Sequence, residues 1–193
     1  MTISLAKKQS VSLTKESNGG LTAITLGVGW DVAKKKGFFG AFTSGGDIDL
    51  DASAILFDGN RQTIDAVWFG QLKSKDGSVR HSGDNLTGEG DGDDESIAID
   101  LQRLPANIET IVLTVNSFRG QTFDKIENAF GRVVDNRTGR ELARFDISDS
   151  GPHTGIILAS LSRAGGEWTF KALGERAGGR TVHELAGPAA HLI

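Results

Sequence analysis

The feature that most constrains the fold is a succession of short apolar segments separated by turn-forming residues. Residues 21–26 alternate apolar and polar side chains, and residues 52–57 form a short apolar run flanked by aspartate and glycine. Both patterns are typical of β-strands, and no long helical pattern lies between them. The sequence therefore predicts an all-β fold, an antiparallel β-sandwich of about ten strands. The predicted strands span residues 10–14, 21–30, 52–57, 66–69, 96–101, 110–115, 129–134, 141–147, 155–161 and 168–173, with hairpin loops at 136–139 and 164–167.

One short helix is expected near the C-terminus. Thr181, followed three residues later by Glu184, is the pattern of a capping box, and Gly187-Pro188 is expected to end this helix. Residues 122–128 are expected to form one or two helical turns, which pack against the sheets.

The length and composition fit one domain without a disulfide framework. At 193 residues, of which 38% are hydrophobic, the chain can bury one core, and we expect a single domain over residues 1–193. Cysteine is absent, which excludes disulfides, thiol chemistry and zinc sites built from thiolates. No apolar run reaches the ~18 residues of a transmembrane helix, and no apolar segment of a secretion signal follows the N-terminal lysines. We therefore expect a cytoplasmic protein.

The net charge of −4 conceals a local concentration of negative charge. Nine of the 25 acidic residues lie in two clusters, and the rest of the chain carries 16 acidic residues against 21 lysines and arginines. Such an asymmetry indicates a site rather than a generally acidic surface. The clusters consist of Asp47, Asp49 and Asp51, and of Asp84, Glu89, Asp91, Asp93, Asp94 and Glu95.

The larger cluster lies in the glycine-rich segment GDNLTGEGDGDDE, residues 83–95. It contains six carboxylates and the amide of Asn85, without lysine or arginine. Two carboxylates about 4 Å apart repel each other by roughly 1–4 kcal/mol, so several such pairs would open the loop unless a cation screened them. The interleaved glycines allow backbone bends that let the oxygens converge. Hard oxygen ligands, without histidine or cysteine nearby, favour Ca²⁺ over zinc, copper or iron, and Ca²⁺ tolerates variable geometry better than Mg²⁺ does.

The smaller cluster, DIDLD at residues 47–51, alternates acidic and apolar residues. In an extended chain its aspartates face one side and its apolar residues face the other. Because it precedes the predicted strand 52–57, we expect it at the same end of the sandwich as residues 83–95, with enough oxygens for one or two Ca²⁺ ions. Asp31, which follows the strand at 21–30, is expected to join from a third loop.

Other interpretations of the acidic residues fit less well. An EF-hand loop counted from Glu89 would need glycine where Asp94 stands, and its flanks are predicted strands instead of helices. A phosphatase nucleophile pair at 49–51 would follow an apolar strand, whereas here the strand comes after the aspartates. A glycosidase pair needs a sugar cleft, and the three tryptophans are expected in the core. A merely solvated acidic surface is the remaining alternative.

Two further features are expected to be structural. The segment KKKGFFGAF, residues 34–42, is expected to be a loop whose aromatic rings lie against the sandwich edge, with contact to an anionic membrane as the alternative. The histidines are scattered along the chain at His81, His153, His183 and His191.

Several sequence blocks resemble the TerD family of tellurium-resistance and stress proteins. These blocks are LGVGWD at 26–31, DLDAS at 49–53 and, most specifically, the unbroken GDNLTGEGDGDDE at 83–95. Further blocks are similar to its TerZ branch, namely KKKG at 34–37, QLKSKDGS at 71–78, TVNSF at 114–118 and GRT at 179–181. The resemblance covers nearly the whole chain.

The resemblance implies a bacterial, cytoplasmic, calcium-binding β-sandwich that acts with other tellurite-resistance proteins, which assemble near the inner face of the membrane. It implies no reaction and no small-molecule substrate, and we expect no nucleic-acid partner. A thiol-based reduction of tellurite is hard to reconcile with the absence of cysteine. The family's acidic motif, together with Asp31, gives the expected calcium ligands Asp31, Asp49, Asp51, Asp84, Asn85, Glu89, Asp91, Asp93, Asp94 and Glu95.

Three functions therefore compete. The first is a non-enzymatic module in which Ca²⁺ stiffens the loops, stabilises the fold and controls association with partner proteins. The second is a calcium-dependent module that binds membranes or anionic ligands. The third is a metal-dependent hydrolase.

Overall fold

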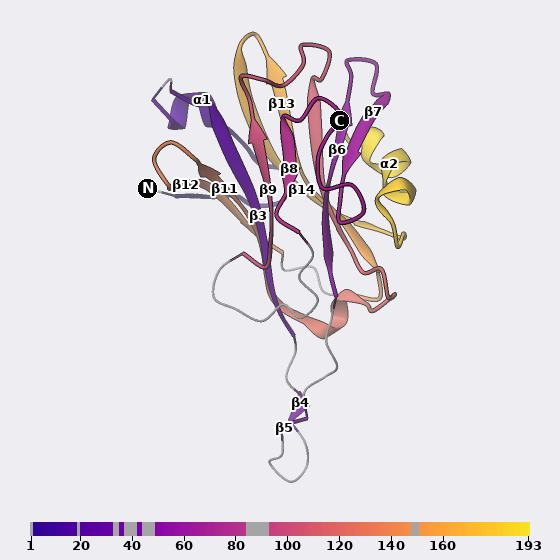
Figure 1. Cartoon of the computed structure of the whole chain (residues 1–193). Helices are drawn as coiled ribbons and strands as arrows, with labels where there is room; N and C mark the ends of the chain where they lie inside the picture. The colour runs from indigo at the N-terminus through magenta and orange to yellow at the C-terminus, as the bar shows by residue number, and fades with distance from the viewer. Residues whose placement is uncertain are drawn as a thin grey trace.

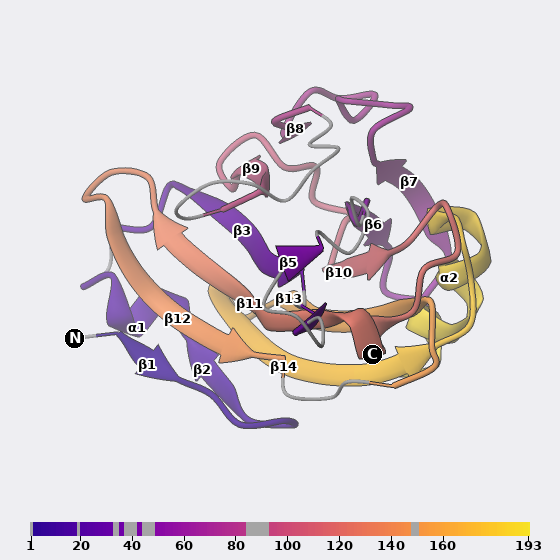
Figure 2. The same ribbon diagram turned by 90° about the horizontal axis from the view of Figure 1, so that it is seen from below.

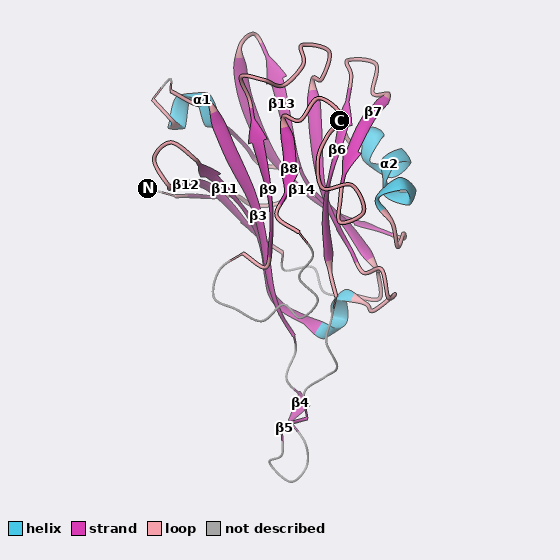
Figure 3. Cartoon of the chain, in the orientation of Figure 1, coloured by secondary structure: helices cyan, strands magenta, loops and turns pink. Residues whose placement is uncertain are grey.

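The structure, a computed structural model, describes residues 2–18, 20–32, 35–36, 42–43, 49–83, 93–147 and 151–193. Two six-stranded sheets lie face to face (Figures 1 and 3). The first sheet contains β1 (Ile3–Ser4), β3 (Ala23–Val32), β8 (Val79–His81), β9 (Glu95–Asp100), β11 (Ile126–Asp135) and β12 (Arg140–Asp146). The second contains β2 (Ser10–Ser12), β6 (Asp51–Phe57), β7 (Thr63–Val67), β10 (Thr110–Asn116), β13 (Gly155–Ala164) and β14 (Glu167–Ala177). The β-sandwich prediction is confirmed.

Neighbouring strands within the sheets are almost all antiparallel. The first sheet has the order β1-β12-β11-β3-β9-β8 and the second the order β2-β14-β13-β10-β6-β7. Only β1 and β12 pair in parallel among the described strands. Figure 2 shows the two sheets from below as curved layers, with α2 (Val182–Ala190) beside β6 and β7 on the outer side of the second sheet. A separate pair is formed by β4 (Lys35–Lys36) and β5 (Phe42–Thr43), and the rest of the 34–42 segment lies outside the described residues.

The burial of each strand follows from what covers its two faces. Every second residue of β9 is buried, as expected when only one face packs on the core. All residues of β6 are buried, because both of its faces are covered. Ala54 and Leu56 join the main core between the sheets, whereas Ile55 and Phe57 join a second core beneath α2. This double burial explains why the β6 sequence is almost continuously apolar.

The C-terminal helix begins as predicted but continues further. The Oγ1 of Thr181 accepts a hydrogen bond from the Glu184 backbone N–H at 3.4 Å, and the Glu184 carboxylate accepts one from the Arg180 N–H at 2.7 Å. The prediction that Gly187-Pro188 ends the helix is wrong, since the helix runs past Pro188 to its last residue, Ala190. Pro188 removes one backbone donor near the helix end, and Ala189 after it is fully buried against the second core. None of the helices described is long and apolar enough to cross a membrane.

Several element boundaries differ from the prediction for local reasons. The strand predicted at 10–14 ends at Ser12, whose Oγ accepts from the Lys15 backbone N–H and caps the short helix α1 (Leu13–Glu16). Residues 122–128 contain one turn, the 3₁₀ helix η1 (Phe123–Lys125). The strand predicted at 66–69 is shifted towards the N-terminus, and Trp68 is only half-buried, whereas Trp30 and Trp168 lie in the main core as expected.

Candidate metal centre

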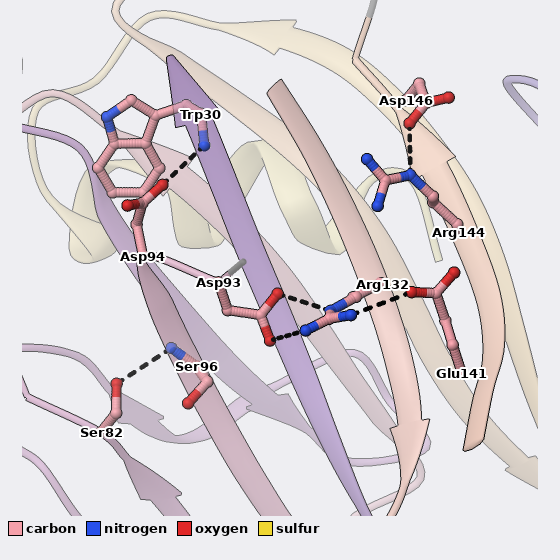
Figure 4. Close-up of polar contacts among 9 residues, drawn as sticks. All are labelled: Trp30, Ser82, Asp93, Asp94, Ser96, Arg132, Glu141, Arg144 and Asp146. Carbon is pink, nitrogen blue, oxygen red and sulfur yellow. Dashed lines mark hydrogen bonds and ion pairs between the residues drawn. The ribbon is translucent and has the colours of Figure 1, made fainter. Parts of the chain in front are cut away.

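Two of the predicted ligands, Asp31 and Asp94, come from the region where β3 ends and β9 begins. The Asp94 backbone N–H donates to the Val28 carbonyl at 2.9 Å, and the Asp94 Oδ2 accepts from the Trp30 backbone N–H at 2.8 Å (Figure 4). These bonds continue the pairing of β3 with β9 beyond its last registered pair, Val28 with Glu95. Asp94 is thus held against β3 at Trp30, and Asp31 is the next residue of β3. The Asp31 and Asp94 carboxylates therefore come from the same pair of adjacent strand ends.

The electrostatic environment of Asp94 is negative. Burial raises the pKa of the Asp94 carboxyl, and the hydrogen bond from Trp30 lowers it. The charges of Asp31, Asp93 and Glu95 raise the pKa of Asp94 further, so that the pKa lies above its ordinary value. A cation at this point would relieve the repulsion.

Glu95 connects the two sheets. It is only 1% exposed, and its Oε2 accepts a hydrogen bond from the backbone N–H of Ala52 at 2.5 Å. The same oxygen lies 3.4 Å from Nε2 of His81. Glu95 and His81 belong to the first sheet and Ala52 to the second, so this buried carboxylate links the two layers at the acidic end of the sandwich.

His81 is oriented by three contacts. Its Nδ1 accepts from the Gly83 backbone N–H at 3.0 Å, which leaves the proton on Nε2, 2.9 Å from the Ala52 carbonyl oxygen. Burial would lower the pKa of His81, but the hydrogen bond and charge of Glu95 outweigh it and hold this pKa above its ordinary value. The expectation that no histidine lies near the acidic residues is therefore wrong. The sequence gives little indication that His81 lies on a strand next to Glu95, because this strand, β8, has only three residues.

Asp49 and Asp51 are buried, with 5% and 3% of their surfaces exposed. Leu50 between them joins the main core, as the predicted alternation requires. Asp51 is the register partner of Asn116 in β10, and the Asp49 Oδ2 lies 3.2 Å from the Arg119 Nε. Both aspartates thus lie at the entrance of β6, where the sequence predicts them.

Asp93 is neutralised by the protein itself. The Nε and Nη2 of Arg132 donate to its two carboxylate oxygens at 2.7 and 3.1 Å, and Nη1 of Arg132 donates to Glu141 at 3.2 Å (Figure 4). The hydrogen bond to Asp93 is the main reason why the pKa of Arg132 is raised. Gly27 makes room for this pair, because a Cβ on Gly27 would lie 2.1 Å from the Asp93 Oδ2. Asp93 therefore belongs to an ion pair on the outer face of the first sheet.

Replacing Gly27 by alanine is expected to break this ion pair. The new methyl group would displace the Asp93 carboxylate and lower the free energy of unfolding by about 1–3 kcal/mol, measured by chemical denaturation. Gly178→Ala is the matched control, since a Cβ there would meet no atom within 4 Å. Adding Asp93→Ala to the Gly27 variant should then cost little more. Equal stability of Gly27→Ala and wild type would contradict the steric role of this position.

The described carboxylates have the right chemistry for Ca²⁺ but form separate neighbourhoods. In the described part of the chain, no three His, Asp or Glu side chains lie close enough together to hold a metal ion. The oxygen donors, their burial and the crowded negative charge at Asp94 nevertheless fit a hard cation. Four of the predicted ligands, Asp84, Asn85, Glu89 and Asp91, lie outside the described residues.

Comparison with known proteins identifies the family. The TerD domain matches residues 1–187. The chain belongs to the TerD family. It is 55% identical to the tellurium resistance protein TerZ of Serratia marcescens over 184 residues, which cover 95% of this chain and 94% of TerZ. It is 43% identical over 185 residues to the stress response protein SCP2 of Bacillus subtilis (strain 168), covering 91% of this chain and 92% of SCP2. The resemblance seen in the sequence motifs is thus confirmed.

A solved structure supports the fold of this TerD-family chain. The crystal structure of a homologue of telluride resistance protein (TerD) from Streptomyces coelicolor A3(2) superposes with a TM-score of 0.69. The match covers 86% of this chain and 96% of that one at 22% sequence identity. This likeness supports the sandwich architecture alone.

Proposed function

We propose that this TerD-family protein is a non-enzymatic calcium-binding module that serves tellurium resistance and stress response. The observation that carries the calcium proposal is the place of Asp94, which is hydrogen-bonded to β3 and lies in the field of three other carboxylates. The acidic run that ends at residue 95 adds further oxygen donors directly before it in the chain. The names of its relatives, which include tellurium resistance and stress proteins, support the biological role.

In this proposal Asp31 and Asp94 are the described calcium ligands at the end of β3. Their carboxylates are drawn from two adjacent strand ends, an arrangement that suits the variable geometry of Ca²⁺. Asp49 and Asp51 are assigned to the same end of the sandwich because they lie at the start of β6. The remaining ligands are assigned on the sequence motif, as Asp84, Asn85, Glu89 and Asp91. A bound ion would supply positive charge next to Asp94, whose carboxylate lies in the field of other carboxylates.

Asp93 and Glu95 have more specific roles in this proposal. The carboxylate of Asp93 already pairs with Arg132, so it shapes the site from the outer face. Glu95 is held by Ala52 and His81 and positions the chain directly after Asp94. Both residues therefore act as supports that keep Asp94 against β3.

Thermal unfolding of chelator-treated protein tests the calcium proposal. Addition of Ca²⁺ at a hundred times its dissociation constant should stabilise the native state by about 2.7 kcal/mol and raise Tm by roughly 5–10 °C. An equal concentration of Mg²⁺ should give a much smaller rise. Asp94→Asn should reduce the calcium effect, because it removes charge but keeps an oxygen for the Trp30 N–H. Asp146→Asn, at a 66% exposed carboxylate, is the control. The same Tm with and without Ca²⁺ would refute the proposal.

We propose that the partners are other tellurite-resistance proteins, met in the cytoplasm or at the inner face of the membrane. Calcium-dependent co-purification with such proteins is the expected result. Calcium-dependent pelleting with anionic vesicles would replace it by membrane binding. Turnover of a phosphoester that disappears in Asp94→Asn would replace the non-enzymatic role by hydrolysis.

A further inference from the structure

A second polar site lies at the end of β9 opposite Glu95. A cavity of about 180 Å³ opens here on the outer face of the first sheet. Its lining combines small side chains with two arginines and an asparagine: Ala23, Gly77, Ser78, Arg80, Ala98, Ile99, Asp100, Arg103 and Asn136. No residue of the candidate metal centre takes part.

The strand register explains why a hollow forms at this place. Ala98 of β9 lies between Thr25 of β3 and Arg80 of β8, and the next outward position of β9, Asp100, pairs with Ala23. Because Ala98 and Ala23 have small side chains, the surface at these positions is recessed between longer side chains. Arg80 lies at one side of this shallow recess.

Three cationic side chains surround this hollow. Arg80 and Arg103 line it, and Lys73 lies beside Gly77 at its rim. The Lys73 Nζ and the Arg103 Nη2 lie 3.2 and 4.0 Å from the point where a Cβ on Gly77 would be, so both charged groups approach the same place. Within the described parts of the chain, none of these three side chains forms an ion pair. Unpaired cations around a hollow are favourable for an anion.

The other polar groups are oriented to leave donors available. The Asn136 Oδ1 accepts from the Thr25 hydroxyl at 2.8 Å, which leaves the amide Nδ2 to donate. The one carboxylate in the lining, Asp100, is engaged locally, because its Oδ1 accepts from the backbone N–H groups of Gln102 and Arg103 at 3.1 Å each. Asp76 beside the hollow likewise accepts from the Ser78 N–H at 2.8 Å. The three cationic side chains outnumber these two carboxylates, so the charge around the hollow is net positive.

We propose that this hollow binds a small oxyanion of the phosphate class. The guanidinium groups of Arg80 and Arg103 offer planar pairs of donors that match such an anion, and Lys73 and Asn136 add a charge and an amide donor. The hollow lies at the opposite end of β9 from the candidate calcium ligand Asp94, and the anion is bound by the protein's own cations without calcium. It is independent of the calcium-binding role.

An NMR titration of the ¹⁵N-labelled full chain with inorganic phosphate tests this site. The titration is done in chelator at low ionic strength, so that binding through calcium is removed and surface charges are not screened. We expect saturable shifts of the backbone amides of Gly77, Ser78 and Asn136. A parallel titration with glycerol 1-phosphate distinguishes free phosphate from a phosphate ester, and saturation by either one supports the site.

Variants decide whether the two arginines form the site. Arg80→Gln and Arg103→Gln should each weaken phosphate binding about tenfold or more, because each removes charged hydrogen bonds. Arg61→Gln is the matched control, since Arg61 is an exposed arginine in the turn between β6 and β7. Both lining arginines are exposed, so the variants should remain folded. Absence of saturable shifts in wild type, or equal weakening by Arg61→Gln, would overturn the proposal.

Discussion

Replacing Glu95 by alanine is expected to lower the free energy of unfolding by about 3 kcal/mol, even in the presence of chelator. The substitution removes a buried side chain that accepts a hydrogen bond from Ala52 and contacts His81. It leaves the Ala52 N–H without its acceptor and opens a cavity between the sheets. The loss is measured by urea or guanidinium denaturation of chelator-treated protein.

Two companion variants separate the roles of Glu95. Glu95→Gln keeps an oxygen that can accept from the Ala52 N–H, so its loss of stability should be smaller. Glu127→Ala changes an exposed glutamate of β11 and should stay within about 0.5 kcal/mol of wild type. If Glu95→Ala were as stable as wild type in chelator, Glu95 would act only through a bound cation and would not link the sheets.

Replacing Leu185 by alanine is expected to cost about 2–5 kcal/mol of unfolding free energy. Leu185 is fully buried in the second core, where α2 covers the outer face of β6. Its Cδ2 lies 3.3 and 3.0 Å from the points where Cβ atoms on Gly155 and Gly179 would be, so glycine backbones pack directly against it. Gly155 is the first residue of β13, and Gly179 lies in the segment before α2. Their backbones cannot easily fill the space that a smaller side chain leaves.

Leu192→Ala provides the control for the Leu185 variant. Leu192 packs against the same core but is only partly buried, so its truncation should cost clearly less. Chemical denaturation of both variants measures the difference. Similar losses for the two would mean that α2 adds little specific packing and acts as a loose cover.

The alternation of apolar residues allows most of the fold to be predicted from the sequence. It locates β9 and β10 within one residue at each end, because each is long enough to show its pattern. It does not reveal β8, whose three residues are too few, and the contact of His81 with Glu95 is therefore not predictable. The pair of Asp93 and Arg132 depends on sheet register over 39 residues of separation, which local sequence does not encode.

For the candidate metal residues, too, the sequence predicts only a part of what the structure shows. The density of acidic residues predicts a site, and in the structure Asp31 lies near enough for its charge to raise the pKa of Asp94. The sequence cannot distinguish the carboxylates that the protein already pairs from those left for a cation. Arg119 and Arg132, which approach Asp49 and Asp93, follow them in the chain by tens of residues. Only the folded arrangement of strands brings these charges together.

The close packing at Gly27 limits how this chain can evolve. Arg132 is the register partner of Gly27, and the Asp93 carboxylate occupies the space above the bare backbone. A side chain at position 27 would exclude that carboxylate and leave the guanidinium with Glu141 alone. Substitutions at 27, 93 and 132 are therefore expected to be tolerated better in combination than singly, which the stability of single and combined variants would show.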